Sequence, residues 1–152
     1  MIASPSSAPL GVDLVGYGLA GQTFHAPLIA ATPGLALRVV VSSRPEAVRG
    51  DLPEVEVLAD LDAALARADI DLIVVATPDA LHAEQSIAAL RAGKSVVVDK
   101  PFAASLAEAE AVAALAAQAP GVFSVFQNRR WDADFLTLRR LIADGALGEI
   151  EV

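Results

Sequence analysis

The chain has 152 residues, of which 55% are hydrophobic and 20% are charged, and its mean hydropathy is +0.52. This apolar content excludes an intrinsically disordered chain, and no apolar run approaches the roughly 18 residues of a membrane span. The net charge is −8, so the chain lacks the excess of basic residues with which nucleic-acid-binding proteins neutralise phosphates. The absence of cysteine excludes disulfides, a Cys-based zinc site and a thiol nucleophile. The start of the chain has no signal-peptide pattern, so we expect a flexible tail over residues 1–10 and a cytoplasmic location.

Strand-like and helix-like segments alternate through the first part of the chain. Residues 12–15 are a short apolar run that ends in glycines, which is typical of a buried strand. Residues 21–31 favour a helix, which Pro27 should kink or restart because proline lacks an N–H group. Residues 36–43 are β-branched and extended, and residues 55–58 predict a weaker strand.

The alternation continues through the middle of the chain. Residues 61–68 favour a helix, and residues 72–76 are the clearest strand. That strand is apolar on both faces, as expected in a parallel sheet that helices cover on both sides. Residues 80–92 predict a helix that Gly93 closes at its C′ position, and residues 95–98 predict another strand.

The last part of the chain adds two helices and a strand. Ser105 and Glu108 form a capping box that opens an alanine-rich helix ending at Gln118. Residues 122–126 predict a strand and residues 132–144 a final helix. Repeated strand–helix units with short connections predict an α/β fold with a doubly wound, mostly parallel sheet.

A glycine-rich turn follows the first predicted strand and opens a helix. In this G-x-G-x-x-G pattern, Gly16 permits a tight turn, Gly18 lets the backbone approach a pyrophosphate, and Gly21 allows close helix–strand packing. The helix N-terminus then offers free N–H groups to an anion. A purely structural turn is the alternative, but the position at the first strand–helix junction favours dinucleotide binding.

The end of the second predicted strand distinguishes NADP from NAD. NAD sites usually carry an acidic residue about 20 residues beyond the glycines, whereas this chain has Ser42, Ser43 and Arg44 there, with no carboxylate before Glu46. Two hydroxyls and a guanidinium can bind a 2′-phosphate, so we favour NADP. The alternative is a solvated turn with an incidental arginine, and NAD stays possible.

Three residues follow the clearest strand, at the edge of the sheet where ligands bind. Thr77 and Pro78 can pack near a dinucleotide, and His82, one turn further on, can face it. A histidine at a helix start is equally often a cap or a surface residue. His25 is near the pyrophosphate helix and has packing as its alternative role.

Asp99-Lys100-Pro101 ends the next strand at the same edge. The Lys100 ammonium can hold a substrate hydroxyl, stabilise developing alkoxide charge and assist proton transfer as a hydride leaves. The alternative is a solvent-exposed lysine before a proline turn.

A basic cluster at residues 127–131 follows the last strand and contains the only tryptophan. In an acidic chain this cluster suggests a local anion pocket. Arg129 and Arg130 can equally pair with Asp132 and Asp134.

Five stretches of the chain, in this order, resemble the N-terminal half of the glucose-fructose oxidoreductase/inositol dehydrogenase (Gfo/Idh/MocA) family. They are G-Y-G-L-A-G at 16–21, F-H-A-P-L-I at 24–29, A-T-P-D-A-L-H at 76–82, A-G-K-S-V-V-V-D-K-P at 92–101 and Q-N-R-R-W-D-A-D-F at 127–135. The second and fifth stretches are most similar to NADP-dependent scyllo-inositol dehydrogenases. The resemblance covers nearly the whole chain from Gly11 to Val152.

The resemblance implies an oxidoreductase that transfers a hydride between NADP(H), with NAD as the alternative, and a secondary alcohol of a cyclic polyol or sugar. Lys100 matches the catalytic lysine of the family's E-K-P motif. Asp99 stands where the family more often has glutamate, which shortens the reach of the carboxylate toward the cofactor. No metal site is implied. The implied cofactor-binding residues are Gly16, Tyr17, Gly18, Leu19, Ala20, Gly21, Ser42, Ser43, Arg44, Thr77, Pro78, His82, Asp99, Lys100 and Asn128.

The resemblance also implies a division into domains. Residues 11–147 correspond to a Rossmann NAD(P)-binding domain, and residues 148–152 to the start of a second domain that supplies substrate contacts and much of a homo-oligomer interface. We therefore expect a fragment that binds NADP but turns over poorly, in a protein without nucleic-acid or membrane partners.

Two other function classes compete with this interpretation. A non-catalytic dinucleotide sensor would use the same cleft without Lys100. An S-adenosylmethionine enzyme would use the glycine turn, but it gives no account of Asp99-Lys100-Pro101 or of Ser42-Ser43-Arg44.

Overall fold

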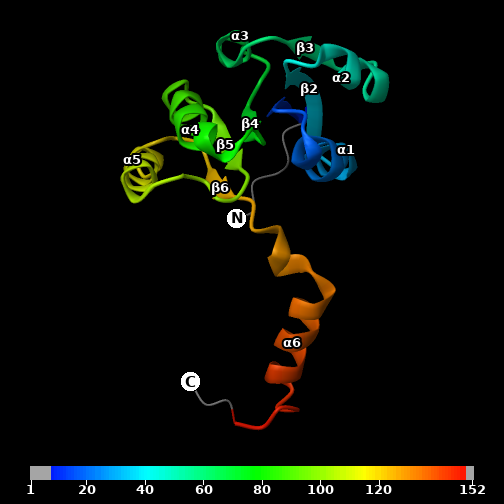
Figure 1. Ribbon diagram of the computed structural model, residues 1–152, viewed down its shortest axis with the longest axis vertical. Coiled ribbons are helices and arrows are strands. Elements are labelled where there is room, and N and C mark those ends of the chain that lie inside the picture. Colours follow the sequence, from blue (N-terminus) through cyan, green and yellow to red (C-terminus); the bar gives the residue numbers. More distant parts are fainter. Residues whose placement is uncertain (1–7, 150–152) are drawn as a thin grey trace.

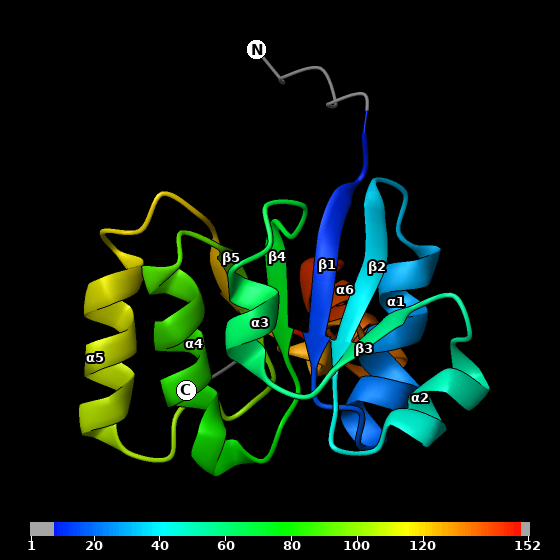
Figure 2. The same cartoon turned by 90° about the horizontal axis from the view of Figure 1, so that it is seen from above.

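The computed structural model describes residues 8–149, which form a six-stranded parallel sheet with helices packed on both faces (Figure 1, Figure 2). The strand order is β3-β2-β1-β4-β5-β6, so the chain winds outward from β1 and then from β4 in the opposite direction. The doubly wound α/β fold predicted from the sequence is confirmed. The strands are β1 (Leu10–Val15), β2 (Leu35–Val41), β3 (Glu56–Leu58), β4 (Leu72–Val75), β5 (Ser95–Val98) and β6 (Phe123–Val125).

Two apolar cores lie on the two faces of the sheet, because alternate residues of a strand point to opposite sides. Val12 and Leu14 of β1 pack on the face covered by α1 and α2, whereas Val15 packs on the face covered by α3, α4 and α5. The α-helices are α1 (Ala26–Ala31), α2 (Pro45–Asp51), α3 (Leu61–Leu65), α4 (His82–Arg91), α5 (Leu106–Ala116) and α6 (Ala133–Ala143), and the shorter helical turns are η1 (Gly21–His25), η2 (Asp79–Leu81) and η3 (Asn128–Trp131).

The capping interactions predicted for the end of α4 and the start of α5 are present in the structure. Gly93 has a φ of +74° and donates its N–H to the Leu90 carbonyl oxygen at 3.0 Å, which closes α4. The Ser105 hydroxyl oxygen accepts the N–H of Glu108 at 3.3 Å and opens α5. The returning bond of the capping box differs, because the Glu108 carboxylate accepts the N–H of Ala104 at 2.9 Å instead of that of Ser105.

Three helical details complete the comparison with the sequence. Pro27 lies in the first turn of α1, after the π-helical turn η1, so the predicted restart is confirmed. Helix α2 was not predicted, because Val48 is its only buried residue and no apolar period marks it. The predicted helix 61–68 ends at Leu65, since Arg67 then bonds only three residues back, to the Ala64 carbonyl.

Helix α6 stands away from the sheet (Figure 1). None of its residues is buried, and its large apolar side chains are 38% to 47% exposed. Residues 148–152, the predicted start of a second domain, fall mostly outside the described residues. Residues 1–7 of the predicted tail also lie outside them, and the last residue of that tail, Leu10, begins β1. Within residues 8–149, no helix is both long and apolar enough to cross a bilayer.

Asp13 is a carboxylic acid buried in the middle of the sheet. It lies in β1 with no exposed surface, and neither carboxyl oxygen has a hydrogen-bond partner among the described residues. Burial raises the pKa of Asp13 to about 7, against the opposing charge of Arg67. The folded protein therefore keeps a proton on Asp13 in a range where the unfolded chain, with a pKa near 3.8, has lost it.

Replacing Asp13 with asparagine should stabilise the protein in a pH-dependent way. As pH rises from about 4 to 7, the unfolded wild type gains stability by ionising Asp13, so the wild-type free energy of unfolding falls over that window. The Asp13→Asn variant lacks this loss. Its free energy of unfolding relative to wild type should be about 2–3 kcal/mol higher at pH 8 than at pH 5, as measured by urea titration. The exposed control Asp62→Asn should change by less than about 1 kcal/mol at both pH values, and an equal effect of Asp13→Asn at both would contradict the assignment.

Candidate functional site

A cleft of about 620 Å³ lies at the carboxyl edge of the sheet, where β1 is flanked by β2 and β4. The three strands point the same way in Figure 2, so the loops that follow them meet at one edge. The strand order reverses here, and α/β sheets bind ligands at such a point. The predicted cofactor-binding residues that line the cleft are Gly16, Tyr17, Gly18, Leu19, Ala20, Ser42, Ser43, Arg44, Thr77 and Pro78.

Two of the three motif glycines are required by the fold itself. Gly16 has a φ of +99°, and a Cβ atom there would lie 2.6 Å from the Ala76 carbonyl oxygen. A Cβ on Gly21 would lie 2.2 Å from the Gly16 carbonyl oxygen. Both glycines therefore let the loop after β1 pack against its own helix and against the end of β4.

Gly18 differs from the other two, because nothing in the fold accounts for it. A Cβ built on Gly18 would meet no atom within 4 Å, and its φ is outside the left-handed region. Gly18 also lines the cleft, so the space that a side chain would fill is the space that a bound pyrophosphate would need. The glycine loop thus fits a dinucleotide.

Among the described residues, Arg44 is the only charged one that lines the cleft. Its guanidinium Nη2 donates to the Tyr17 carbonyl oxygen at 2.5 Å, and its backbone N–H donates to the Ser42 hydroxyl at 3.0 Å. These contacts hold the loop after β2 against the glycine loop. Among the lining residues there is no carboxylate, so the electrostatics of this corner favour an anion.

Tyr17 lines the cleft and also belongs to the apolar core beneath it. It is 4% exposed, and its hydroxyl donates to Asp51 Oδ2 at 3.3 Å. Gln22 Nε2 donates to the same carboxylate oxygen at 2.5 Å. Burial, followed by the charge of Asp51, raises the pKa of Tyr17. Asp51, at the end of α2, therefore anchors the glycine loop.

One polar residue of the cleft, Gln85, was not predicted from the sequence. Its side-chain oxygen accepts the Thr77 hydroxyl at 2.6 Å, which orients Thr77, and its amide nitrogen can donate to a ligand. Gln85 follows the lining residue Leu81 by four positions on one face of the helical segment. That spacing was the available signal.

His82 lies beneath the cleft and is not among its lining residues. It is 1% exposed, with Nδ1 2.7 Å from the Pro101 carbonyl oxygen and Nε2 2.7 Å from the Thr77 carbonyl oxygen. Since both ring nitrogens face carbonyl oxygens, no ring nitrogen is left for a ligand. Contact between His82 and a cofactor stays a prediction.

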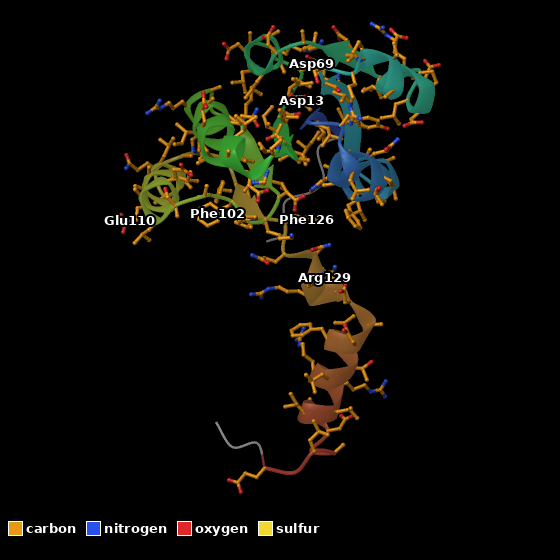
Figure 3. The ribbon with its side chains drawn as sticks, in the orientation of Figure 1. Asp13, Asp69, Phe102, Glu110, Phe126 and Arg129 are labelled. Carbon is orange, nitrogen blue, oxygen red and sulfur yellow. The ribbon has the colours of Figure 1, made fainter. Side chains whose placement is uncertain are left out.

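Asp99 and Lys100 follow β5, which pairs with β4, the strand that Thr77 follows. The Lys100 side chain is exposed and outside the lining of the cleft, and its backbone N–H donates to Asp99 Oδ1 at 2.8 Å. Asp99 Oδ2 lies 3.6 Å from Nε2 of the buried His25, whose ring lies 4.5 Å from that of Phe126 (labelled in Figure 3). Burial lowers the pKa of His25, while the charge of Asp99 raises it.

The predicted residues after β6 form a separate group. Asn128 opens the turn η3 and lines a different hollow, of about 450 Å³, on the open face of β5 and β6. Arg129, labelled in Figure 3, pairs with Asp132 through Nη1 and Oδ2 at 2.9 Å and is exposed. The alternative pairing given by the sequence analysis therefore holds for Arg129.

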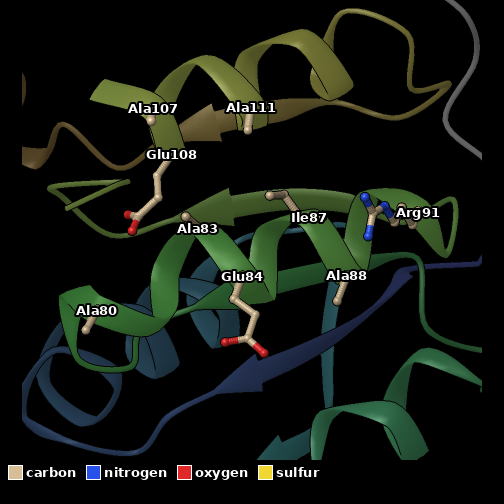
Figure 4. Close-up of a pocket in the computed structure, with 9 residues that line it drawn as sticks. All are labelled: Ala80, Ala83, Glu84, Ile87, Ala88, Arg91, Ala107, Glu108 and Ala111. Atoms are coloured by element: carbon tan, nitrogen blue, oxygen red, sulfur yellow. The ribbon is translucent and has the colours of Figure 1, made fainter. Parts of the chain in front are cut away.

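Another hollow, of about 710 Å³, lies between α4 and α5 (Figure 4). It is lined mostly by alanine, with charged side chains at its rim. None of the predicted site residues lines it.

The family model for the oxidoreductase family with an NAD-binding Rossmann fold matches residues 10–127. The chain belongs to this family, GFO_IDH_MocA, which confirms the predicted resemblance.

Relatives and solved structures agree with this membership. The chain is 52% identical over 139 residues to the uncharacterized oxidoreductase YdgJ of Escherichia coli (91% of this chain, 40% of the relative). It is 40% identical over 139 residues to scyllo-inositol 2-dehydrogenase (NADP(+)) IolW of Bacillus subtilis (91% and 39%). A crystal structure from Klebsiella pneumoniae matches with a TM-score of 0.89 and 48% identity (93% and 41%). The chain thus spans about 40% of the length of these relatives.

Alanine substitutions at two motif glycines should separate binding from folding. Gly18→Ala should weaken NAD(P)H binding more than tenfold, because the methyl group occupies the pyrophosphate space, and should change the free energy of unfolding by less than about 0.5 kcal/mol. Gly21→Ala, the matched control, should cost about 1–3 kcal/mol because its Cβ collides with backbone. Nucleotide fluorescence titration and urea unfolding measure the two effects. Unchanged nucleotide affinity in Gly18→Ala would contradict a pyrophosphate at this loop.

Proposed function

We propose that the chain is the cofactor domain of an oxidoreductase that transfers a hydride between NADP(H) and a secondary alcohol of a cyclic polyol or sugar. The observation that carries the proposal is the cleft itself, which combines a glycine cradle with Arg44 as its only charged residue. The substrate class is supported by the relatives, among which are IolW and inositol 2-dehydrogenases.

The choice of NADP over NAD rests on the loop after β2. Ser42, Ser43 and Arg44 line the cleft, and no carboxylate there would repel a 2′-phosphate. The guanidinium bonds only a carbonyl oxygen in this structure, so its remaining N–H groups can donate to a phosphate.

Replacing Arg44 should lower the affinity for NADPH selectively. Loss of charge-assisted hydrogen bonds should raise the NADPH Kd of Arg44→Ala about 10- to 100-fold and the NADH Kd less than about threefold. The control Arg49→Ala removes an exposed arginine of α2 that pairs with Glu46, outside the cleft lining, and should change neither. Fluorescence titration with both cofactors is the measurement. Wild-type binding of NADH as tight as that of NADPH would refute the NADP preference.

Lys100 is the proposed catalytic residue. Bound NADP supplies the carbon that accepts or returns the hydride. The exposed ammonium of Lys100 follows β5 at the carboxyl edge of the sheet, where it can donate a hydrogen bond to the substrate oxygen and stabilise negative charge on it.

We further propose that α6 packs against a second domain that completes the substrate site. Its exposed apolar side chains and the greater length of the relatives support this proposal.

The 152-residue chain alone should bind NADP(H) and show little or no polyol-dependent NADPH formation. In a protein that carries the second domain, Lys100→Met should lower kcat by about 100-fold or more while NADPH still binds. Absorbance at the nicotinamide band follows turnover. Rapid turnover by the isolated chain would contradict the two-domain proposal, and an unchanged kcat in Lys100→Met would contradict the catalytic role of Lys100. Nucleotide binding without any turnover by the two-domain wild type would favour the non-catalytic sensor.

A further inference from the structure

The side chains of the two histidines, His25 and His82, lie close to the same three residues, 99–101. Residues 99–101, which we name the lysine turn, follow β5 and carry the exposed Lys100. His25 is 3% exposed and His82 is 1% exposed, so both rings belong to the interior. Buried polar groups are costly unless they have partners, and the Pro101 carbonyl oxygen of the lysine turn is such a partner for His82. Nε2 of His25 has no hydrogen-bond partner among the described residues, and Asp99 Oδ2 of the lysine turn lies 3.6 Å from it.

His82 holds one end of the lysine turn. One ring nitrogen lies 2.7 Å from the Pro101 carbonyl oxygen and the other 2.7 Å from that of Thr77. Thr77 lines the cleft, so a single buried ring lies between the wall of the cleft and the residue after Lys100. An imidazole with one N–H donates to one of these two carbonyl oxygens.

His25 faces the other end of the lysine turn. Its Nε2 is 3.6 Å from Asp99 Oδ2, and Phe126 packs against its ring at a centroid distance of 4.5 Å. The other carboxylate oxygen of Asp99 accepts the Lys100 N–H at 2.8 Å. His25 lies in η1, which begins at the last glycine of the motif.

We infer that His25 and His82 are positioning residues that fix the lysine turn relative to the two loops that form the cofactor cleft. The inference rests on the proposed function, in which Lys100 acts beside a nucleotide in that cleft. Lysine has a long, flexible side chain, and a fixed backbone at its base reduces the freedom that must be lost when its ammonium engages a substrate.

The backbone amide of Lys100 reports on this arrangement directly. The chain has only two lysines, Lys94 and Lys100, so protein labelled with ¹⁵N-lysine gives two amide signals. In His82→Leu and in His25→Phe, the Lys100 signal should shift and its amide exchange should quicken. The Lys94 signal should stay in place, because Lys94 lies at the opposite edge of the sheet, where its Nζ donates to Arg67 and Ile70 carbonyls.

Two further variants separate positioning from general loss of structure. Ser86→Ala removes a buried hydroxyl of α4 that has no partner among the described residues, and it should move neither lysine signal. His82→Gln keeps an amide donor and should shift Lys100 less than His82→Leu does. If His82→Leu does not fold, the position of the Lys100 signal in His82→Gln is compared with its position in Ser86→Ala. A shift in His82→Gln alone supports the positioning role, and no shift in either contradicts it.

Nucleotide binding gives a second readout. The Kd of NADPH should rise about fivefold in His82→Leu, because Thr77 in the cleft wall loses its contact with the ring, while that of 2′,5′-ADP, which lacks the nicotinamide half, should change less than twofold. A Lys100 signal that stays in place in folded His82 and His25 variants overturns the inference. Failure of wild-type protein to bind NADPH would instead overturn the proposed function, and the lysine signals would still decide the positioning role.

Discussion

The loop after β1 lies so close to its neighbours that no side chain fits between them. Gly16 lies against the end of β4, and Gly21 lies against Gly16 itself. This close packing brings the end of β1 against the end of β4, and the Arg44 guanidinium bonds the loop from the β2 side. The cleft lies where these three segments meet, with glycine contacts between the ends of β1 and β4 and the Arg44 side chain between the loops after β1 and β2.

The charged residues at the two edges of the sheet differ in the contacts that their side chains make within the protein. At the amino edge, Lys94 donates to two carbonyl oxygens, and Arg67 pairs with Asp69 and with Glu56. At the carboxyl edge, Lys100 is exposed, and the Arg44 guanidinium bonds only a carbonyl oxygen among the described residues. The same residue types are therefore used for fixed contacts at one edge and left available at the other.

Most of the fold could be predicted from the sequence, because buried parallel strands are short apolar runs and helix ends carry local signals such as Gly93 and Ser105. Helix α2 was not predicted, since its single buried residue, Val48, gives no periodic apolar pattern in the sequence. Within the site, the glycine loop, the serine–arginine corner and Thr77-Pro78 were predicted and share one cleft. Gln85 was missed, because its position on the cleft depends on how α4 packs.

The sequence by itself determined the alternation of strands and helices, the family and the residues at the carboxyl ends of the strands, because each of these depends on neighbours along the chain. Only the tertiary structure decided that Gly18 is not required by the fold, that Arg44 has no acidic neighbour in the cleft, and that both histidines meet the lysine turn. These facts depend on contacts between residues far apart in sequence. Such contacts form only when the sheet brings its loops to a common edge.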